Sequence, residues 1–155
     1  MTVHSLHIFD RKGKTLFTKR YMAAAASADG EQSDENYLSE QRKLIFGMLF
    51  SLRETTRCLA PTNNETDGMV HSIATAASTL HTLETASGLR FCLYTTAKDR
   101  KQHRTIQVAL QHMYQVVWIQ CVTRSPVYRP TDPNIAETNF EQQVDEFLKV
   151  QPWFS

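Results

Sequence analysis

The chain has 155 residues, enough for one domain with a sizeable core. It carries 17 Lys and Arg against 16 Asp and Glu, and this net charge of +1 gives no global electrostatic reason to expect nucleic-acid or anionic-membrane binding. The three cysteines, Cys58, Cys92 and Cys121, are odd in number and widely separated, which excludes a disulfide framework and a Cys-x-x-Cys metal motif.

The N-terminus indicates where the protein resides and how the fold begins. It lacks the basic and apolar regions of a secretory signal, and no run approaches the ~20 apolar residues that span a bilayer, so we expect a soluble cytosolic protein. Residues 3–9 alternate imperfectly, meet a turn sequence from Asp10 to Gly13, and are followed by a second apolar stretch at 15–21. This pattern predicts an N-terminal β-hairpin.

The next segment loses its apolar pattern. Small and polar residues dominate residues 22–36, so we expect a flexible low-complexity insertion at about residues 22–38. An alternative is that residues 22–28 extend the preceding strand or form a short helix. Ser39 is a suitable N-cap for the helix that follows, and Pro61 would end that helix.

The longest apolar segment, residues 44–53, lies within this helix. At helical spacing its members Leu44, Ile45, Met48, Leu49 and Leu52 share one arc, which we expect to face the core. Phe46 and Phe50 widen the apolar girth to roughly 240°, and Gly47 and Ser51 leave a notch beside them. Such a helix must be covered on two sides. The second cover is either another protein or the C-terminal segment of the same chain, and the helical pattern leaves both open.

The middle of the chain predicts three further strands, at residues 69–76, 80–85 and 89–96. The last two are joined by Ala86-Ser87-Gly88, which predicts a hairpin. Residues 98–124 then read as a second long helix, whose buried arc is expected to hold Ile106, Leu110, Met113, Val117 and Cys121.

The C-terminal part combines a proline-rich segment with a last helix. Pro126, Pro130 and Pro133 predict an extended loop. A short helix at about residues 139–150 is expected to bury Phe140, Val144, Phe147 and Leu148. Trp153 and Phe154 follow, and such an aromatic terminus is not expected to stay in water. We therefore include both in a candidate interface.

The predicted order is ββαβββαα in a single domain over residues 1–155. An α+β fold follows, with a five-stranded antiparallel sheet flanked by helices. This is the order of the longin or profilin-like fold.

The sequence offers little support for catalysis. Cys92 and His81 are the least implausible nucleophile and base, but the chain contains no nucleophile elbow, phosphate-binding loop or zinc-binding helix motif. His4 and His7 lie on opposite faces of their strand, and three-residue spacing there cannot chelate a metal. We therefore expect a noncatalytic chain with no cofactor and no metal.

A basic cluster opens the second long helix. Arg100, Lys101 and Arg104 share an arc where cations oppose the helix dipole, so they do not stabilise the helix. The simpler interpretation, a solvated helix end, is favoured. The alternative is a docking patch for an acidic partner or anionic lipid head groups.

Several segments resemble one known family in matching order. They are residues 1–11, 44–53 and 80–88, the run His112-Met113-Tyr114, the pair Ser125-Pro126 and the ending Pro152-Trp153-Phe154. These segments resemble the sybindin-like family, subunit one of the TRAPP (transport protein particle) complex. The resemblance runs nearly end to end.

The resemblance implies a longin fold and a role in vesicle tethering. It implies other TRAPP subunits as partners and a contribution to guanine-nucleotide exchange on a Rab-family GTPase, at endoplasmic reticulum and cis-Golgi membranes. The helical geometry independently makes Phe46, Gly47, Phe50 and Ser51 candidates for a subunit interface. A small longin-fold subunit of a vesicle-coat adaptor complex is the alternative function.

Overall fold

The computed structural model describes residues 2–21, 31–61, 68–96, 102–129, 135 and 138–154, with only the backbone for residues 31–35. The expected α+β class and the order of the first six elements are confirmed. The elements are β1 (Val3–Phe9), β2 (Thr15–Arg20), α1 (Glu31–Leu59), β3 (Ser72–Ala74), β4 (Ser78–Glu84), β5 (Arg90–Thr96), α2 (His103–His112), the π-helix η2 (Met113–Thr123) and α3 (Phe140–Lys149).

The five strands form one antiparallel sheet in the order β2-β1-β5-β4-β3. Both predicted hairpins are present. In the first turn the Asp10 carboxylate accepts hydrogen bonds from the backbone N–H groups of Lys12 and Lys14, both at 2.8 Å. In the second turn Gly88 adopts a φ of +85°, a conformation that glycine reaches without steric cost. Strand β3 (Ser72–Ala74) is much shorter than the strand predicted at residues 69–76.

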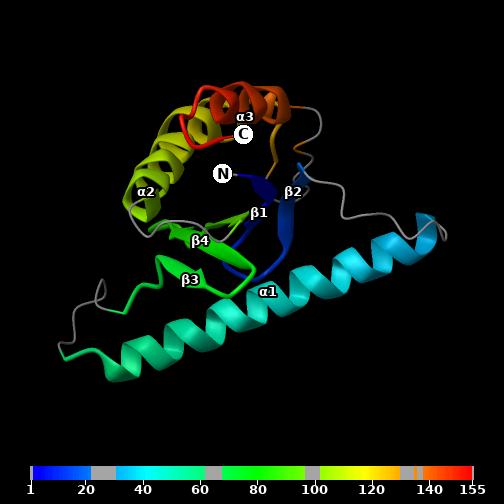
Figure 1. Ribbon diagram of the computed structural model, residues 1–155. Helices are drawn as coiled ribbons and strands as arrows, with labels where there is room; N and C mark the ends of the chain where they lie inside the picture. The colour runs from blue at the N-terminus through cyan, green and yellow to red at the C-terminus, as the bar shows by residue number, and fades with distance from the viewer. Residues whose placement is uncertain are drawn as a thin grey trace.

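Helices cover both faces of the sheet, which gives three layers (Figure 1). The long helix α1 crosses one face, while α2, η2 and α3 cover the other. Consecutive residues Arg90, Phe91, Cys92 and Leu93 of the central strand β5 are consequently all buried. The larger core cluster lies on the α2–α3 side, and a smaller one, built on Phe9, Ile45, Leu49, Leu80 and Cys92, lies under α1.

Helix α1 begins at Glu31, well before the predicted N-cap Ser39. The predicted insertion at residues 22–38 is therefore wrong over residues 31–38, while residues 22–30 lie outside the described part. The physical reason is that extending an existing helix needs no new nucleation. A polar stretch rich in Glu and Gln can join a helix without a buried face of its own. The predicted end before Pro61 is confirmed.

The second long helix is not α-helical throughout. Its described part begins at Gln102, the N-cap of α2. From Met113 the backbone forms the π-helix η2, in which the N–H of Arg124 at the C-terminal end donates to the Ile119 carbonyl at 3.0 Å. A wider turn brings residues five apart onto one face. Trp118 and Val122 are therefore buried, whereas Cys121, which we expected in the buried arc, is only partly covered.

The wider turn of η2 places the Trp118 ring inside the core. The ring lies edge-on between Phe91 of the sheet and Phe140 of α3, with centroid distances of 5.7 and 5.3 Å. The sequence prediction followed a four-residue spacing and could not anticipate this change of period. The last helix forms where predicted, with Phe140, Val144 and Leu148 buried, but Phe147, which we also expected to be buried, is only partly covered.

Candidate functional site

The inner face of α1 packs on the sheet through a narrow stripe. Ile45 and Leu49 are buried there, and Phe46 lies against Phe9 with ring centroids 5.9 Å apart. The guanidinium of Arg90 sits over the Phe46 ring, with its Cζ 4.9 Å from the centroid. Phe46 is therefore a contact between α1 and the sheet.

This placement corrects two predictions. Phe46 does not belong to an exposed interface, and Leu44 and Met48 do not face the core, since Leu44 is 73 % exposed and Met48 37 %. Two apolar arcs flank the same central pair, Ile45 and Leu49, and helical periodicity alone does not say which arc turns inward. The sheet selects Phe46, because Phe9 and Arg90 offer its ring an aromatic and a cationic partner.

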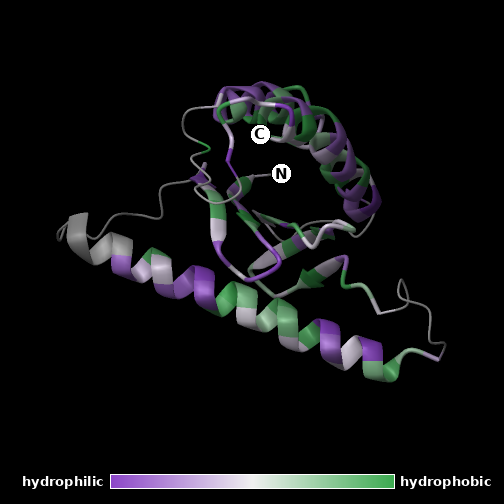
Figure 2. Ribbon diagram, turned by 180° about the vertical axis from the view of Figure 1, so that it is seen from behind, coloured by the Kyte–Doolittle hydropathy of each residue, from purple (hydrophilic) through white to green (hydrophobic). Residues whose placement is uncertain are grey.

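The outer face of α1, which we define as Leu44, Gly47, Met48, Phe50 and Ser51, is exposed to solvent. Phe50 is 52 % exposed, and hydrophobic colouring is concentrated near the middle of α1 (Figure 2). A Cβ built on Gly47 would meet no other heavy atom within 4 Å, so the predicted notch with Ser51 is open. The outer face presents apolar side chains around a place where another backbone could approach closely.

The C-terminal aromatic residues lie elsewhere. Trp153 is 4 % exposed and belongs to the larger core cluster, and Phe154 packs edge-on against Tyr21 at 5.7 Å. Helix α3 and the C-terminus lie on the side of the sheet opposite α1 (Figure 1). The C-terminal segment therefore does not cover α1, and Trp153 and Phe154 do not join the outer face.

The basic cluster is described only at one residue. Arg104 is exposed in the first turn of α2, whereas Arg100 and Lys101 lie outside the described residues.

The candidate nucleophile Cys92 and the candidate base His81 lie on opposite faces of the sheet. Cys92 pairs with Thr82 across the β4–β5 ladder, so it points toward α1, while His81 is opposite Leu93 and points toward α2. Burial raises the pKa of the Cys92 thiol to about 12, which keeps it protonated. Burial, with a smaller contribution from the charge of His103, lowers the pKa of His81 to about 4. The sheet itself separates this pair.

The described residues include neither a candidate metal site nor a membrane-spanning helix. No three His, Cys, Asp or Glu side chains among them are grouped as metal ligands would be. No helix built from them is long and apolar enough to cross a membrane.

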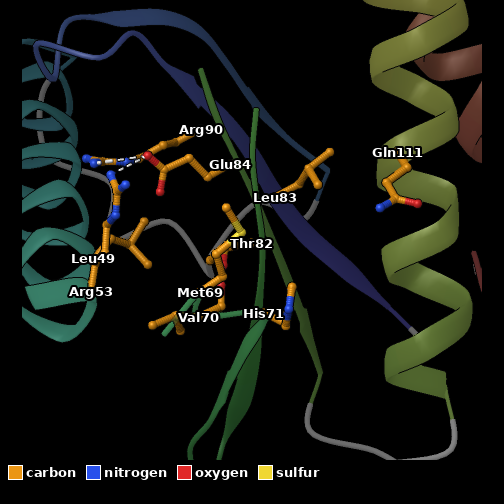
Figure 3. A pocket seen from close by; sticks show the side chains of 10 residues that line it. All are labelled: Leu49, Arg53, Met69, Val70, His71, Thr82, Leu83, Glu84, Arg90 and Gln111. Atoms are coloured by element: carbon orange, nitrogen blue, oxygen red, sulfur yellow. Dashed lines mark hydrogen bonds and ion pairs between the residues drawn. The ribbon is translucent and has the colours of Figure 1, made fainter. Parts of the chain in front are cut away.

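The sequence analysis missed a charged pocket of about 130 Å³ beside α1 (Figure 3). Arg53 of α1, Glu84 of β4 and Arg90 of β5 meet there. The Glu84 Oε1 atom lies 2.5 Å from Arg53 Nη1 and 3.6 Å from Arg90 Nη2. The available signal was that Arg90 shares a strand face with Cys92 and Tyr94. Both faces of β5 are covered, so Arg90 had to be buried with a charged partner.

Comparisons of the sequence with known proteins found similar chains. The model of the Sybindin-like family matches residues 3–151. The Saccharomyces cerevisiae protein named "Trafficking protein particle complex subunit BET5" is 36 % identical over 115 residues, 74 % of this chain and 70 % of the relative. The Homo sapiens protein "Trafficking protein particle complex subunit 1" is 28 % identical over 155 residues, 100 % of this chain and 97 % of the relative. The Dictyostelium discoideum protein of the same name is 23 % identical over 153 residues, 99 % of each chain.

Proposed function

This chain belongs to the Sybindin-like family, and from that premise we propose that it is a subunit of a TRAPP-type trafficking complex. Its relatives are named as subunits of the trafficking protein particle complex. The same names favour this proposal over a small subunit of a vesicle-coat adaptor complex. The chain contributes structure and contact surface, and it performs no catalysis by itself.

The observation that carries the proposal is the outer face of α1. Helices already cover both faces of the sheet, so the chain needs no further cover for its own core. Leu44, Met48 and Phe50 nevertheless stay exposed on adjacent turns. A group of neighbouring exposed apolar side chains is typical of a protein interface, where buried aromatic residues usually contribute most of the affinity.

The notch gives this interface its shape. Gly47 and Ser51 are one turn apart, and neither carries a bulky side chain that would hold a partner away. The Phe50 ring stands beside them as the aromatic anchor. We expect a partner subunit to pack an apolar surface over Leu44 and Phe50 and to bring its backbone close at Gly47.

The finer part of the proposal concerns the assembled complex. Through neighbouring subunits, the chain contributes to a composite surface that promotes guanine-nucleotide exchange on a Rab-family GTPase. Exchange requires a surface that binds the nucleotide-free GTPase better than the nucleotide-bound form, and a rigid scaffold meets that requirement without a nucleophile or base. The complex would act peripherally at endoplasmic reticulum and cis-Golgi membranes.

Affinity purification of the tagged chain tests this proposal. Wild type is compared with Phe50→Asp and with the control Val108→Asp, which places the same charge on an exposed apolar residue of α2. We expect wild type and the control to retain other TRAPP subunits, identified by mass spectrometry, and the folded Phe50→Asp chain to lose at least one. Equal recovery by all three folded chains would exclude the outer face, and wild type purifying alone as a monomer would exclude the complex.

A further inference from the structure

We propose that the pocket beside α1 is a carboxylate-binding site in which Arg90 and Arg53 contact the ligand. The pocket is lined by residues of α1, of the segment around residues 69–71 and of strands β4 and β5, and by Gln111 of α2. Figure 3 shows both guanidinium groups converging on the Glu84 carboxylate at the α1 end of the pocket. The site is separate from the outer face, because Arg53 and Leu49 belong to the inner side of the helix.

The charges at this site do not balance. Both arginines approach the same oxygen of Glu84, at 2.5 Å from Arg53 Nη1 and 3.6 Å from Arg90 Nη2. No other acidic residue lines the pocket within the described part of the chain. One carboxylate thus serves two guanidinium groups, and one positive charge remains to be neutralised.

Arg90 carries a buried hydrogen-bond donor that has no acceptor among the described residues. The residue is only 7 % exposed, its guanidinium is covered by the Phe46 ring, and its Nη1 atom has no hydrogen-bond partner among the described residues. A buried charged donor without an acceptor is costly, and Arg90 lines the pocket, so an acceptor that binds its guanidinium from the pocket stabilises the arrangement.

The charged groups and the lining residues of the pocket favour one class of acceptor. The two oxygens of a carboxylate match the planar fork of a guanidinium, and a single excess positive charge suits a monoanion. Leu49, Met69 and Val70 are among the other lining residues and suit a short aliphatic stem, and polar groups of His71, Thr82 and Gln111 also line the pocket. The source is either an Asp or Glu side chain of a partner protein or a free small carboxylate. Arg53 is partly exposed, which leaves the site reachable from solvent.

The first experiment titrates the isolated full chain with sodium acetate. Acetate replaces chloride at constant ionic strength, and the Nε–Hε signals of the arginine side chains are followed by NMR. We expect saturable shifts at Arg53 and Arg90 and at least a roughly tenfold weaker affinity in Arg53→Gln, because one charge-assisted contact is lost. Arg57→Gln is the matched control, since it removes an exposed arginine one turn along the same helix.

Glu84→Gln distinguishes a binding site from a merely structural ion pair. The variant keeps the shape of the side chain but removes the internal competitor for both arginines. We expect acetate to bind roughly tenfold more tightly, whereas a purely structural pair predicts no gain. Arg53→Gln provides the decisive comparison if Glu84→Gln does not fold.

The assembled complex identifies the source. If a partner side chain fills the pocket, acetate no longer shifts the Arg90 signal in the complex, and Arg53→Gln weakens assembly more than Arg57→Gln. If acetate still binds in the complex, the ligand is a free small carboxylate. The absence of saturable shifts in the isolated chain, or equal acetate affinity in Arg53→Gln and Arg57→Gln, would overturn the site. These titrations involve no partner, so their result is independent of the proposed function.

Discussion

The ring of Phe46 occupies the space that a side chain at Gly13 would need. A Cβ built on Gly13 would lie 2.8 Å from Phe46 Cε1, closer than two nonbonded carbon atoms approach. Gly13 also has a φ of +87°, where other residues are strained. The tip of the first hairpin and α1 can therefore meet only because this position has no side chain.

Gly13→Ala is expected to lower the free energy of unfolding by about 1–3 kcal/mol, through backbone strain and the contact with Phe46. Gly47→Ala is the matched control. This second glycine is helical and has open space around it, so alanine should raise stability by about 0.5–1 kcal/mol. Urea denaturation measures both effects, and a shift in the same direction for both variants would contradict this account.

Phe46→Ala should mainly lower the stability of the fold, whereas Phe50→Ala should mainly weaken binding to partner subunits. Phe46 packs on Phe9 and Arg90, so its truncation should cost about 2 kcal/mol, less than a fully buried phenylalanine would. Phe50 is half exposed, and its truncation should change stability by less than about 1 kcal/mol. Retention of partner subunits should fall for Phe50→Ala. The assignment of the two faces would be wrong if the larger stability loss came from Phe50→Ala.

Stability should fall as the pH drops from 6.5 toward 4. Burial, with the positive charges of Arg42 and Arg20, lowers the pKa of His7 to about 4, and burial does the same for His81. Between pH 4 and pH 6.5 the unfolded chain binds protons that the folded chain does not. Each of the two histidines therefore lowers the free energy of unfolding by about 1.4 kcal/mol for each pH unit of acidification.

Unfolding free energies measured by urea at pH 5, 5.5, 6 and 6.5 test this dependence. In His7→Gln the slope should be about half that of wild type over this window, because one of the two histidines no longer titrates. The slope is the relevant quantity, since the variant also loses hydrogen bonds to Ser5 and Thr18. Identical slopes would show that His7 is not responsible.

The cysteines should differ in reactivity. Cys58 is exposed, whereas Cys92 is fully buried and its thiol pKa is raised to about 12 by burial. At pH 8, iodoacetamide should modify Cys58 readily and Cys92 only after unfolding. Mass spectrometry of labelled peptides, with and without urea, measures both rates. Rapid native labelling of Cys92 would contradict its position under α1.

Local patterns in the sequence predicted most of the fold. The turn from Asp10 to Gly13 and the hairpin glycine Gly88 predicted two strand pairs, and the apolar spacing of Phe140, Val144 and Leu148 predicted α3. These features depend on residues close together in the chain. Local sequence patterns are therefore sufficient to predict them.

Features that depend on distant contacts could not be predicted in the same way. Phe46 faces inward because Phe9, Gly13 and Arg90 surround it, and none of these is near it in sequence. Trp118 is buried because the helix widens to place its ring between two others. The Arg53–Glu84–Arg90 cluster joins three elements, and its charge imbalance appears only when the sheet is assembled.

We expect the exposed outer face of α1 to limit how much of the free chain a cell can keep. A copy without a partner displays Leu44 and Phe50 to chaperones and proteases, which recognise exposed apolar segments. Binding to a partner removes that signal and adds stability by mass action. The steady-state amount of this chain should therefore follow the supply of its partner more closely than its own rate of synthesis.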